Sequence, residues 1–280
     1  MFLLRILLVI FIRVGINMRK YLFIFKSEIM TNLQYVFNLF VGFIGYFVML
    51  FILFNLWKYL YSDPNELING YSMTSMMWYV VITEILYSVV GGRTLCKKIS
   101  NDVKSGNVAY NINKPYSYIG YAVSSHFGSM FIKFIMYSIL GIGFGLLFIG
   151  KLPNLSLVGI IFLLVSMFLG LLISTLLILS IGLFSFYIED SGPFYWVYSK
   201  LILVLGTLFP IEYFPSIVQK ILVYTPVYVV NYGPAKLFVD FNIYKGVGII
   251  IAQIIYVIVA YLVCNLIYRK GVRRINVNGG

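Results

Sequence analysis

Six apolar runs constrain this chain more than any other feature of its sequence. Each is compared with the roughly 20 apolar residues that a helix needs to cross the hydrocarbon core of a bilayer. The fifth run is short and meets Pro210, so its backbone must be buried in protein or face water at that break. The sequence therefore predicts an all-α membrane protein with six transmembrane helices, at residues 35–57, 73–92, 127–149, 156–187, 195–209 and 246–268.

The composition excludes a soluble protein, because 61% of the 280 residues are hydrophobic and only 11% are charged. A soluble core of this size could not bury so much apolar surface. The net charge of +12 does not predict nucleic-acid binding, since the basic side chains flank apolar runs instead of forming a stripe with interleaved aromatic residues. Two cysteines, Cys96 and Cys264, are too few for a disulfide framework, and we expect both to be reduced.

The distribution of lysine and arginine predicts which ends of the spans face the cytosol. With six spans, both termini and the segment between the second and third spans share one side and carry 14 of the 21 basic residues. We therefore expect a multi-pass protein of a bacterial inner (plasma) membrane with both termini in the cytosol. The 14 residues are Arg5, Arg13, Arg19, Lys20, Lys26, Arg93, Lys97, Lys98, Lys104, Lys114, Arg269, Lys270, Arg273 and Arg274.

Residues 93–115 form a basic polar island between two apolar runs. Leu95, Ile99 and Val103 recur every fourth residue, which predicts a short helix with one apolar face. Gly106 would end this helix, because glycine readily adopts the left-handed conformation. The basic island is either a contact for a protein outside the membrane or a solvated loop that only fixes the topology.

The sequence lacks the motifs of several kinds of catalysis. No Gly-x-x-x-x-Gly-Lys-Ser/Thr phosphate loop is present, so we do not expect the chain to hydrolyse ATP by that route. His126 is the only histidine and has no Cys, Asp or Glu at metal-ligand spacing, which predicts a packing role and no metal site. With one histidine and no Gly-x-Ser-x-Gly turn, we predict no catalytic residues.

Glu84 falls near the middle of the second apolar run, where an ionised side chain is costly. One interpretation is that it lines a polar cavity or binds a cationic group. The other is a carboxyl that is paired across the bundle or kept protonated by desolvation. The sequence leaves both interpretations open.

The region before the first span predicts a helix that lies on the membrane surface. Residues 1–17 are expected to be an N-terminal extension, and residues 18–34 an interfacial helix that is basic enough to lie against anionic headgroups. The apolar face of this helix would consist of Leu22, Phe25, Ile29 and Leu33.

Three prolines interrupt the apolar segment that follows the fifth span, at Pro210, Pro215 and Pro226. Between the last two, the sequence predicts a short helix with Ile217, Ile221 and Leu222 on its apolar side, and a turn is expected at residues 231–234. We interpret residues 209–234 as a pair of short helices that dip into the outer leaflet.

Four groups of residues carry a family resemblance that covers the chain from Met18. They are Arg19, Lys20 and Tyr21 with Phe25 and Lys26; residues 105–110 leading to Lys114 and Pro115; Phe214 and Pro215 leading to Pro226; and residues 232–235. In their order, spacing and topology they resemble the type-2 ABC exporter permeases, in the subgroup where two related six-span proteins accompany one ATPase. Lys114 stands where members of that subgroup often have arginine.

The resemblance implies a permease subunit that moves a substrate from the cytosol or inner leaflet outward by alternating access. ATP and Mg would bind to a separate ATPase, and this chain would hold no cofactor. The expected partners are ABC ATPase subunits, the lipid bilayer and a second permease chain. The resemblance favours a related chain over another copy of this one, and the sequence leaves both open. The alternative is a non-transporting membrane anchor or assembly partner in a heterodimeric permease. A lipid-modifying enzyme would need converging catalytic groups, which the sequence lacks.

The resemblance also assigns regions and residues. The permease domain is expected to span residues 35–268, with a coupling loop at 93–116 and a re-entrant region at 209–234, and residues 269–280 form a cytosolic tail. The implied ATPase-coupling residues are Lys98, Asn101, Asp102, Lys104, Ser105, Gly106 and Tyr110. The expected translocation pathway contains Glu84, Pro210, Phe214, Pro215 and Pro226. The interfacial helix would touch the ATPase near Arg19, Lys20 and Lys26.

Overall fold

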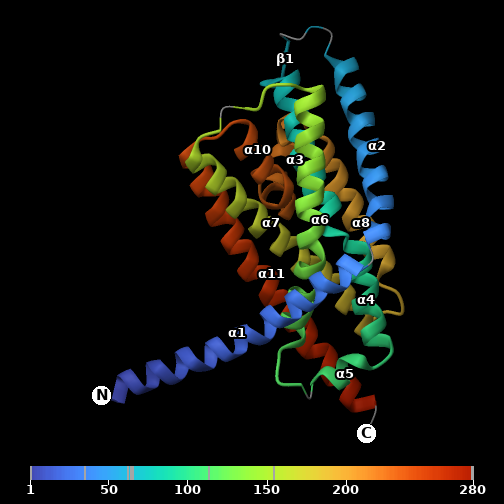
Figure 1. The fold of residues 1–280 in the computed structure, drawn as a ribbon. Coiled ribbons are helices and arrows are strands. Elements are labelled where there is room, and N and C mark those ends of the chain that lie inside the picture. Colours follow the sequence, from blue (N-terminus) through green and yellow to red (C-terminus); the bar gives the residue numbers. More distant parts are fainter. Residues whose placement is uncertain are drawn as a thin grey trace.

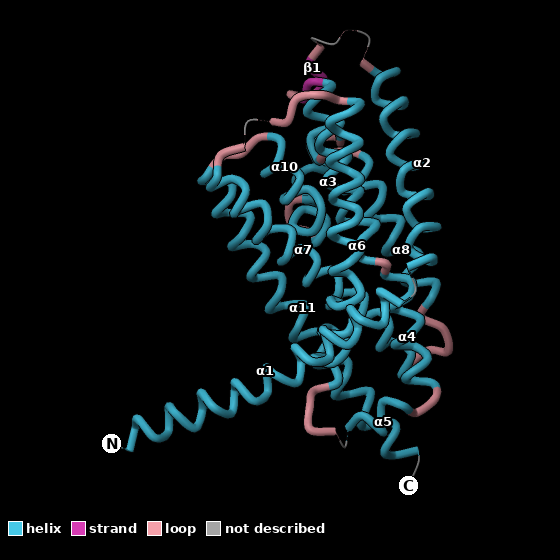
Figure 2. Tube along the Cα trace, viewed as in Figure 1, coloured by secondary structure: helices cyan, strands magenta, loops and turns pink. Residues whose placement is uncertain are grey.

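The computed structural model describes residues 2–34, 36–61, 63, 66–112, 114–153 and 155–278, without the side chains of residues 2–17, 36–40, 109, 112 and 275–278. The chain is a bundle of helices that run between two ends, with a small β-hairpin at one end and both termini toward the other (Figure 1). Helices form almost all of the described chain (Figure 2). We call these the hairpin end and the terminal end of the bundle.

Five helices in the described part of the chain are long and apolar enough to cross a membrane. They correspond to the first, second, third, fourth and sixth expected spans, and they confirm an all-α membrane protein. In chain order they are α2 (Val36–Leu60), α3 (Met73–Val90) continued by α4 (Gly92–Lys104), α6 (Tyr118–Phe148), α7 (Leu157–Leu183) and α11 (Ile243–Asn278).

The fifth expected span corresponds to a shorter helical run. α8 (Gly192–Ile202) continues as the π-helix η2 (Leu203–Leu208), which ends just before Pro210. The other described elements are α1 (Phe2–Gln34), the hairpin strands β1 (Leu67–Ile68) and β2 (Tyr71–Ser72), α5 (Asn107–Ile112), η1 (Phe184–Phe186), η3 (Ile211–Tyr213), α9 (Ser216–Leu222), η4 (Tyr228–Tyr232) and α10 (Gly233–Val239).

Serine residues mark where three long helices begin. The hydroxyls of Ser72, Ser117 and Ser156 each accept a hydrogen bond from the backbone amide three residues later, at the starts of α3, α6 and α7. Such a cap satisfies a backbone donor that the helix leaves unpaired. α3 ends at Gly91, whose φ of 52° is left-handed, and α4 begins at the next residue. α3 and α4 are therefore almost continuous, with a single break at this glycine.

Close helix packing in the core depends on a small residue opposite a large one. Trp78 of α3 is fully buried, and its indole N–H donates to the carbonyl oxygen of Lys151 at 3.0 Å. Gly145 of α6 lies against the same indole ring, so any side chain at position 145 would collide with it. This contact holds α3 and α6 close together.

The backbone of η2 is buried against α3, and side chains satisfy its polar groups. Tyr79 donates from its hydroxyl to the carbonyl oxygen of Gly206 at 2.9 Å, and Thr83 donates to that of Thr207 at 3.0 Å. Asn231 of η4 donates to the Thr207 hydroxyl at 2.7 Å. Of the two surroundings expected for the break after the fifth span, protein or water, these contacts show protein around η2.

The backbone of η4 is held in the same way between α7 and α11. Gln253 is fully buried, and its side-chain amide donates to the carbonyl oxygens of Val229 at 2.7 Å and Ser166 at 2.9 Å. Gly170 of α7 lets η4 approach, because a Cβ there would lie only 2.8 Å from the carbonyl oxygen of Val230. One amide side chain thus joins three elements.

The expected turn at residues 231–234 is wrong. η4 passes directly into α10, so residues 228–239 form one helical run. Pro234 lies in the first turn of α10, where its missing backbone N–H is tolerated. The π-helical turns before it have wider hydrogen-bond spacing. Pro234 therefore accompanies a change of helical geometry and does not end the helix. The short helix expected between Pro215 and Pro226 is confirmed as α9.

Replacing Gln253 with Leu should destabilise the bundle. The substitution leaves the carbonyl oxygen of Val229 buried without its side-chain donor, which is expected to lower the free energy of unfolding by about 1–3 kcal/mol. The midpoint of thermal unfolding in detergent measures the effect. Ile251→Leu, on the exposed side of the same helix, is the control. An equal midpoint for both variants would contradict the role assigned to Gln253.

Candidate functional site

α4 is a surface helix that its apolar face fixes to the bundle. Leu95, Ile99 and Val103 are all buried, as the four-residue spacing predicted. Ile99 packs against Gly182 of α7, where a Cβ would lie 2.8 Å from the Cβ of Ile99. The helix ends at Lys104, and Gly106 adopts a φ of +74°, as expected for a glycine that stops a helix. The helical prediction for the first half of the basic island is confirmed.

α4 and α5 lie at the terminal end of the bundle (Figure 1). Asn101, Lys104 and Ser105 are exposed, and Tyr110 is 70% exposed. The ammonium group of Lys114 lies 4.7 Å from the centre of the Tyr110 ring, a cation–π distance. These side chains form a polar surface that a partner outside the membrane can reach, and we call it the α4–α5 surface.

Two of the expected coupling residues face α6 instead. Lys98 donates from Nζ to the Ser125 hydroxyl at 3.0 Å, and Asp102 accepts a hydrogen bond from the Tyr118 hydroxyl at 3.0 Å. Both contacts attach α4 to α6, so these residues fix the position of the helix. The sequence pattern did not distinguish them from their exposed neighbours.

α1 crosses α6 at the terminal end of the bundle, at a wide angle to the long helices (Figure 1). Lys20 donates from Nζ to the carbonyl oxygen of Pro115, and the Tyr21 hydroxyl accepts from the backbone N–H of Ser117, both at 3.0 Å. Glu28 accepts from the Ser125 hydroxyl at 2.9 Å. Arg19 and Lys26 remain exposed on the helix surface.

Part of the expected apolar face of α1 contacts the bundle, because the Phe25 ring lies 5.7 Å from that of Phe131 on α6 and Ile29 packs against the core. Leu22 and Leu33 are 60% and 52% exposed, whereas Tyr21 and Glu28 face α6. Exposed leucines suit a helix that lies against lipid, and polar residues suit the contact with the polar start of α6. Sequence analysis missed Tyr21 and Glu28 as contact residues, because their partners Ser117 and Ser125 are far away in the sequence.

An open groove lies beside α4 and α8 at the terminal end. It encloses about 1120 Å³, and its basic lining residues are Arg93, Lys97, Lys104 and Lys200. A second cavity of about 260 Å³ shares Tyr87, Arg93, Tyr195 and Ser199 with the groove and extends to Asn231 of η4. Together they make a polar and aromatic hollow from the terminal end to the π-helical region.

Glu84 lies inside the bundle and lines neither of these two cavities. It is 4% exposed, and its Oε1 accepts a hydrogen bond from the Ser88 hydroxyl at 3.1 Å. Its Oε2 has no hydrogen-bond partner among the described residues. Tyr46 and Tyr137 are its neighbours on α2 and α6. A role for Glu84 in a translocation pathway stays a prediction.

A cluster at the hairpin end joins the interrupted segment to the hairpin and to α10. Glu212 accepts hydrogen bonds from the hydroxyls of Tyr232 at 2.6 Å and Tyr71 at 3.2 Å, and Lys236 lies 3.4 Å from its carboxylate. Lys236 also donates to the Tyr71 hydroxyl at 3.1 Å. We call these four residues the outer cluster. Sequence analysis did not single out Glu212, although a carboxylate between two prolines in an apolar segment was a visible signal.

The expected pathway prolines stand at element boundaries around the outer cluster. Pro210 is buried immediately before η3, Pro215 immediately precedes α9, and Pro226 precedes η4. The carbonyl oxygen of Phe214 accepts a hydrogen bond from the Gln219 side chain at 2.8 Å. These contacts give the segment a defined conformation, and its use as an exit path stays a prediction.

The described residues contain no cluster of three or more His, Cys, Asp or Glu side chains suited to a metal ion. Residues 44–279 match the family model described as ABC-2 family transporter protein. This chain belongs to that family. It is a type-2 ABC permease, the membrane component of an ABC transporter that associates with a separate ATPase. No individual curated protein matches the sequence.

The matched region of the permease begins inside α2 and includes the α4–α5 surface, the open groove and the outer cluster. α1 lies outside it. The family match therefore covers every cavity and surface described above except the contacts that α1 contributes.

Replacing Glu212 with Gln should loosen the outer cluster while keeping its shape. The change removes the ion pair with Lys236, which is partly exposed and therefore screened, and weakens two hydrogen bonds from tyrosines. We expect a loss of about 1 kcal/mol, or roughly fivefold faster exchange of the amide hydrogens of residues 67–72. Hydrogen–deuterium exchange measures this, with Glu189→Gln near the terminal end as the control. Unchanged exchange in the hairpin would contradict the prediction.

Proposed function

We propose that this chain is the transmembrane permease subunit of an exporter, which moves a substrate from the cytosol or inner leaflet outward with the energy of a separate ATPase. The observation that carries the proposal is how α4 is held. Three buried apolar side chains and the contacts of Lys98 and Asp102 attach it to α6 and α7. Asn101 and Lys104 of α4, with Tyr110 of α5, are exposed for a partner.

In this proposal ATP and Mg bind to the partner ATPase, and the α4–α5 surface receives the motion that ATP binding produces. The substrate enters the open groove, passes toward Asn231 and leaves past residues 209–234 by alternating access. Tyrosines and basic side chains line the entrance, and the outer cluster closes the opposite end. Lys98 and Asp102 keep α4 fixed to α6, whereas Asn101, Lys104, Ser105 and Tyr110 contact the ATPase.

The terminal end of the bundle is the cytosolic end in this proposal. Three basic groups, on α1, on the α4–α5 surface and near the end of α11, lie toward the same end of the bundle (Figure 1). A shared basic side is the signature of cytosolic loops. In this orientation the α8–η2 run also crosses the membrane, which brings the number of crossings to six. Residues 18–34 then lie on the inner surface of a bacterial plasma membrane, and residues 269–280 form a cytosolic tail.

A second permease chain, related to this one, would cover α8. Lys200 is exposed on this helix beside the open groove, and contact with lipid would be costly for an ammonium group within a span. A protein partner can shield this residue and close the groove. The exposed apolar side chains available for the contact are Phe194, Trp196, Val197, Leu201 and Val204.

The variant Lys104→Glu with Tyr110→Ala tests the coupling role. Reversing one exposed charge and removing one exposed ring should weaken ATPase binding, with a loss of about tenfold or more in the ATPase activity that co-purifies with the permease. The control is Lys151→Glu with Tyr59→Ala, which makes the same changes at exposed positions at the hairpin end. Full activity in the Lys104 and Tyr110 variant, with the protein folded, would refute this role.

Cysteine labelling tests the orientation. Cys96 and Cys264 are buried, so a membrane-impermeant maleimide should react mainly with an introduced thiol. We expect Tyr59→Cys to be labelled in intact cells and Tyr110→Cys only after permeabilisation, because these residues are exposed at opposite ends of the bundle. The reverse pattern would place the α4–α5 surface outside the cell and refute the proposed function.

A further inference from the structure

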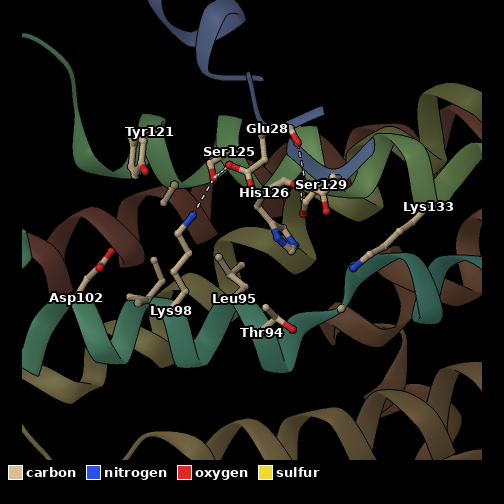
Figure 3. A pocket seen from close by; sticks show the side chains of 14 residues that line it. Glu28, Thr94, Leu95, Lys98, Asp102, Tyr121, Ser125, His126, Ser129 and Lys133 are labelled. Carbon is tan, nitrogen blue, oxygen red and sulfur yellow. Dashed lines mark hydrogen bonds between the residues drawn. The ribbon is translucent and has the colours of Figure 1, made fainter. Parts of the chain in front are cut away.

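A separate small cavity lies where α1, α4 and α6 meet (Figure 3). Its volume is about 140 Å³, and its polar lining includes Glu28 from α1, Lys98 from α4, and Ser125, His126 and Lys133 from α6. One water molecule needs only about 10–15 Å³ measured in this way, so the space fits a group much larger than a single water. It is distinct from the open groove, with which it shares no lining residue.

The imidazole of His126 points into this cavity (Figure 3). His126 is 8% exposed, and its Nε2 has no hydrogen-bond partner among the described residues. A buried polar atom without a partner is costly, and native structures rarely leave one so. A polar group bound in the cavity would give this nitrogen a partner.

The ammonium groups in the cavity also lack ionic partners. Lys133 extends from α6 toward His126, and it makes no hydrogen bond or ion pair with any described residue (Figure 3). Lys98 is exposed at the mouth of the cavity; its Nζ donates to the Ser125 hydroxyl and lies 5.7 Å from the centre of the Tyr121 ring, with no carboxylate within ion-pair distance in the described chain. Two positive charges on two different helices thus face one space.

The two carboxylates around the cavity already have hydrogen-bond donors. Glu28 accepts from the Ser125 hydroxyl, and Asp102 accepts from the Tyr118 hydroxyl. Neither forms an ion pair with Lys98 or Lys133 within the described residues. The charges without a counter-ion are positive, so the lining favours an anion with several hydrogen-bond acceptors.

We propose that this cavity binds a phosphate group, held by Lys98, Lys133 and His126. A phosphate oxygen can accept hydrogen bonds from both ammonium groups while the imidazole Nε2 bonds another oxygen. The phosphate bridges α4 and α6 and so strengthens the attachment of α4 to the bundle.

The headgroup of an inner-leaflet phospholipid is the source of phosphate that the surroundings favour. α1 crosses beside the cavity, and an interfacial helix lies at headgroup depth, so this choice rests on the membrane orientation proposed above. On the outer surface of α6, Phe131, Ile135 and Ile139 are exposed in a line toward the bilayer interior. An exposed apolar stripe suits a helix face that contacts lipid. Free inorganic phosphate could bind through the same contacts as the headgroup, and the titration below distinguishes these two ligands.

The test measures thermal unfolding of the purified permease during titration with short-chain lipids. Dihexanoyl phosphatidylglycerol should raise the midpoint and saturate, whereas dihexanoylglycerol, with the same chains and no phosphate, should not. Inorganic phosphate is the third ligand. Saturation with the lipid alone assigns the site to a headgroup, and saturation with inorganic phosphate assigns it to a free anion. Equal effects of the two lipids would overturn the proposal without the use of any variant.

Two single variants locate the binding. Lys98→Met and Lys133→Met should each weaken phosphatidylglycerol binding by about tenfold or more, because each removes a charge-assisted hydrogen bond. Lys26→Met removes a charge from the exposed surface of α1 nearby and should leave the titration unchanged. Equal losses in all three variants would show diffuse attraction to the basic surface and would also overturn the proposal. The readout requires neither ATP nor a transport substrate, so it can fail while the proposed export function stands.

Discussion

The fold depends on how the chain satisfies its backbone where helices depart from regular geometry inside the bundle. In a bilayer such groups have no water to bind, and each must find a protein partner. The side chains of Tyr79, Thr83 and Gln253 supply these partners for η2 and η4. The donors belong to α3 and α11, which are long regular helices. The irregular region is therefore supported by the regular helices around it.

Local patterns in the sequence were enough to predict the regular elements. Apolar runs placed the long helices, because span length and hydropathy are properties of neighbouring residues. The spacing of Leu95, Ile99 and Val103 predicted both the existence of α4 and its buried face, and Gly106 predicted its end. The break before Pro210 was also predictable, since proline cannot donate to a helix.

The partners of polar residues could not be predicted, because they are far apart in the sequence. Lys98 and Asp102 looked like their neighbours, and only the position of α6 shows that their side chains bind Ser125 and Tyr118. Glu28 meets Ser125 across 97 positions, and Glu212 meets Tyr71 across 141. No periodicity encodes such pairs. The helical continuity through Pro234 was missed because proline was treated as a stop, whereas the π-helical turns before it accommodate the residue.

Gly91 divides one long helical run into α3 and α4, which meet at this residue. On one side of the joint, α4 rests on α7 and presents its polar surface at the terminal end of the bundle. On the other side, Tyr79 and Thr83 hold the carbonyl groups of η2. In the proposed function, a force that the ATPase applies to α4 would reach the π-helical region through the backbone of α3, and Gly91 is the one break in that helical run.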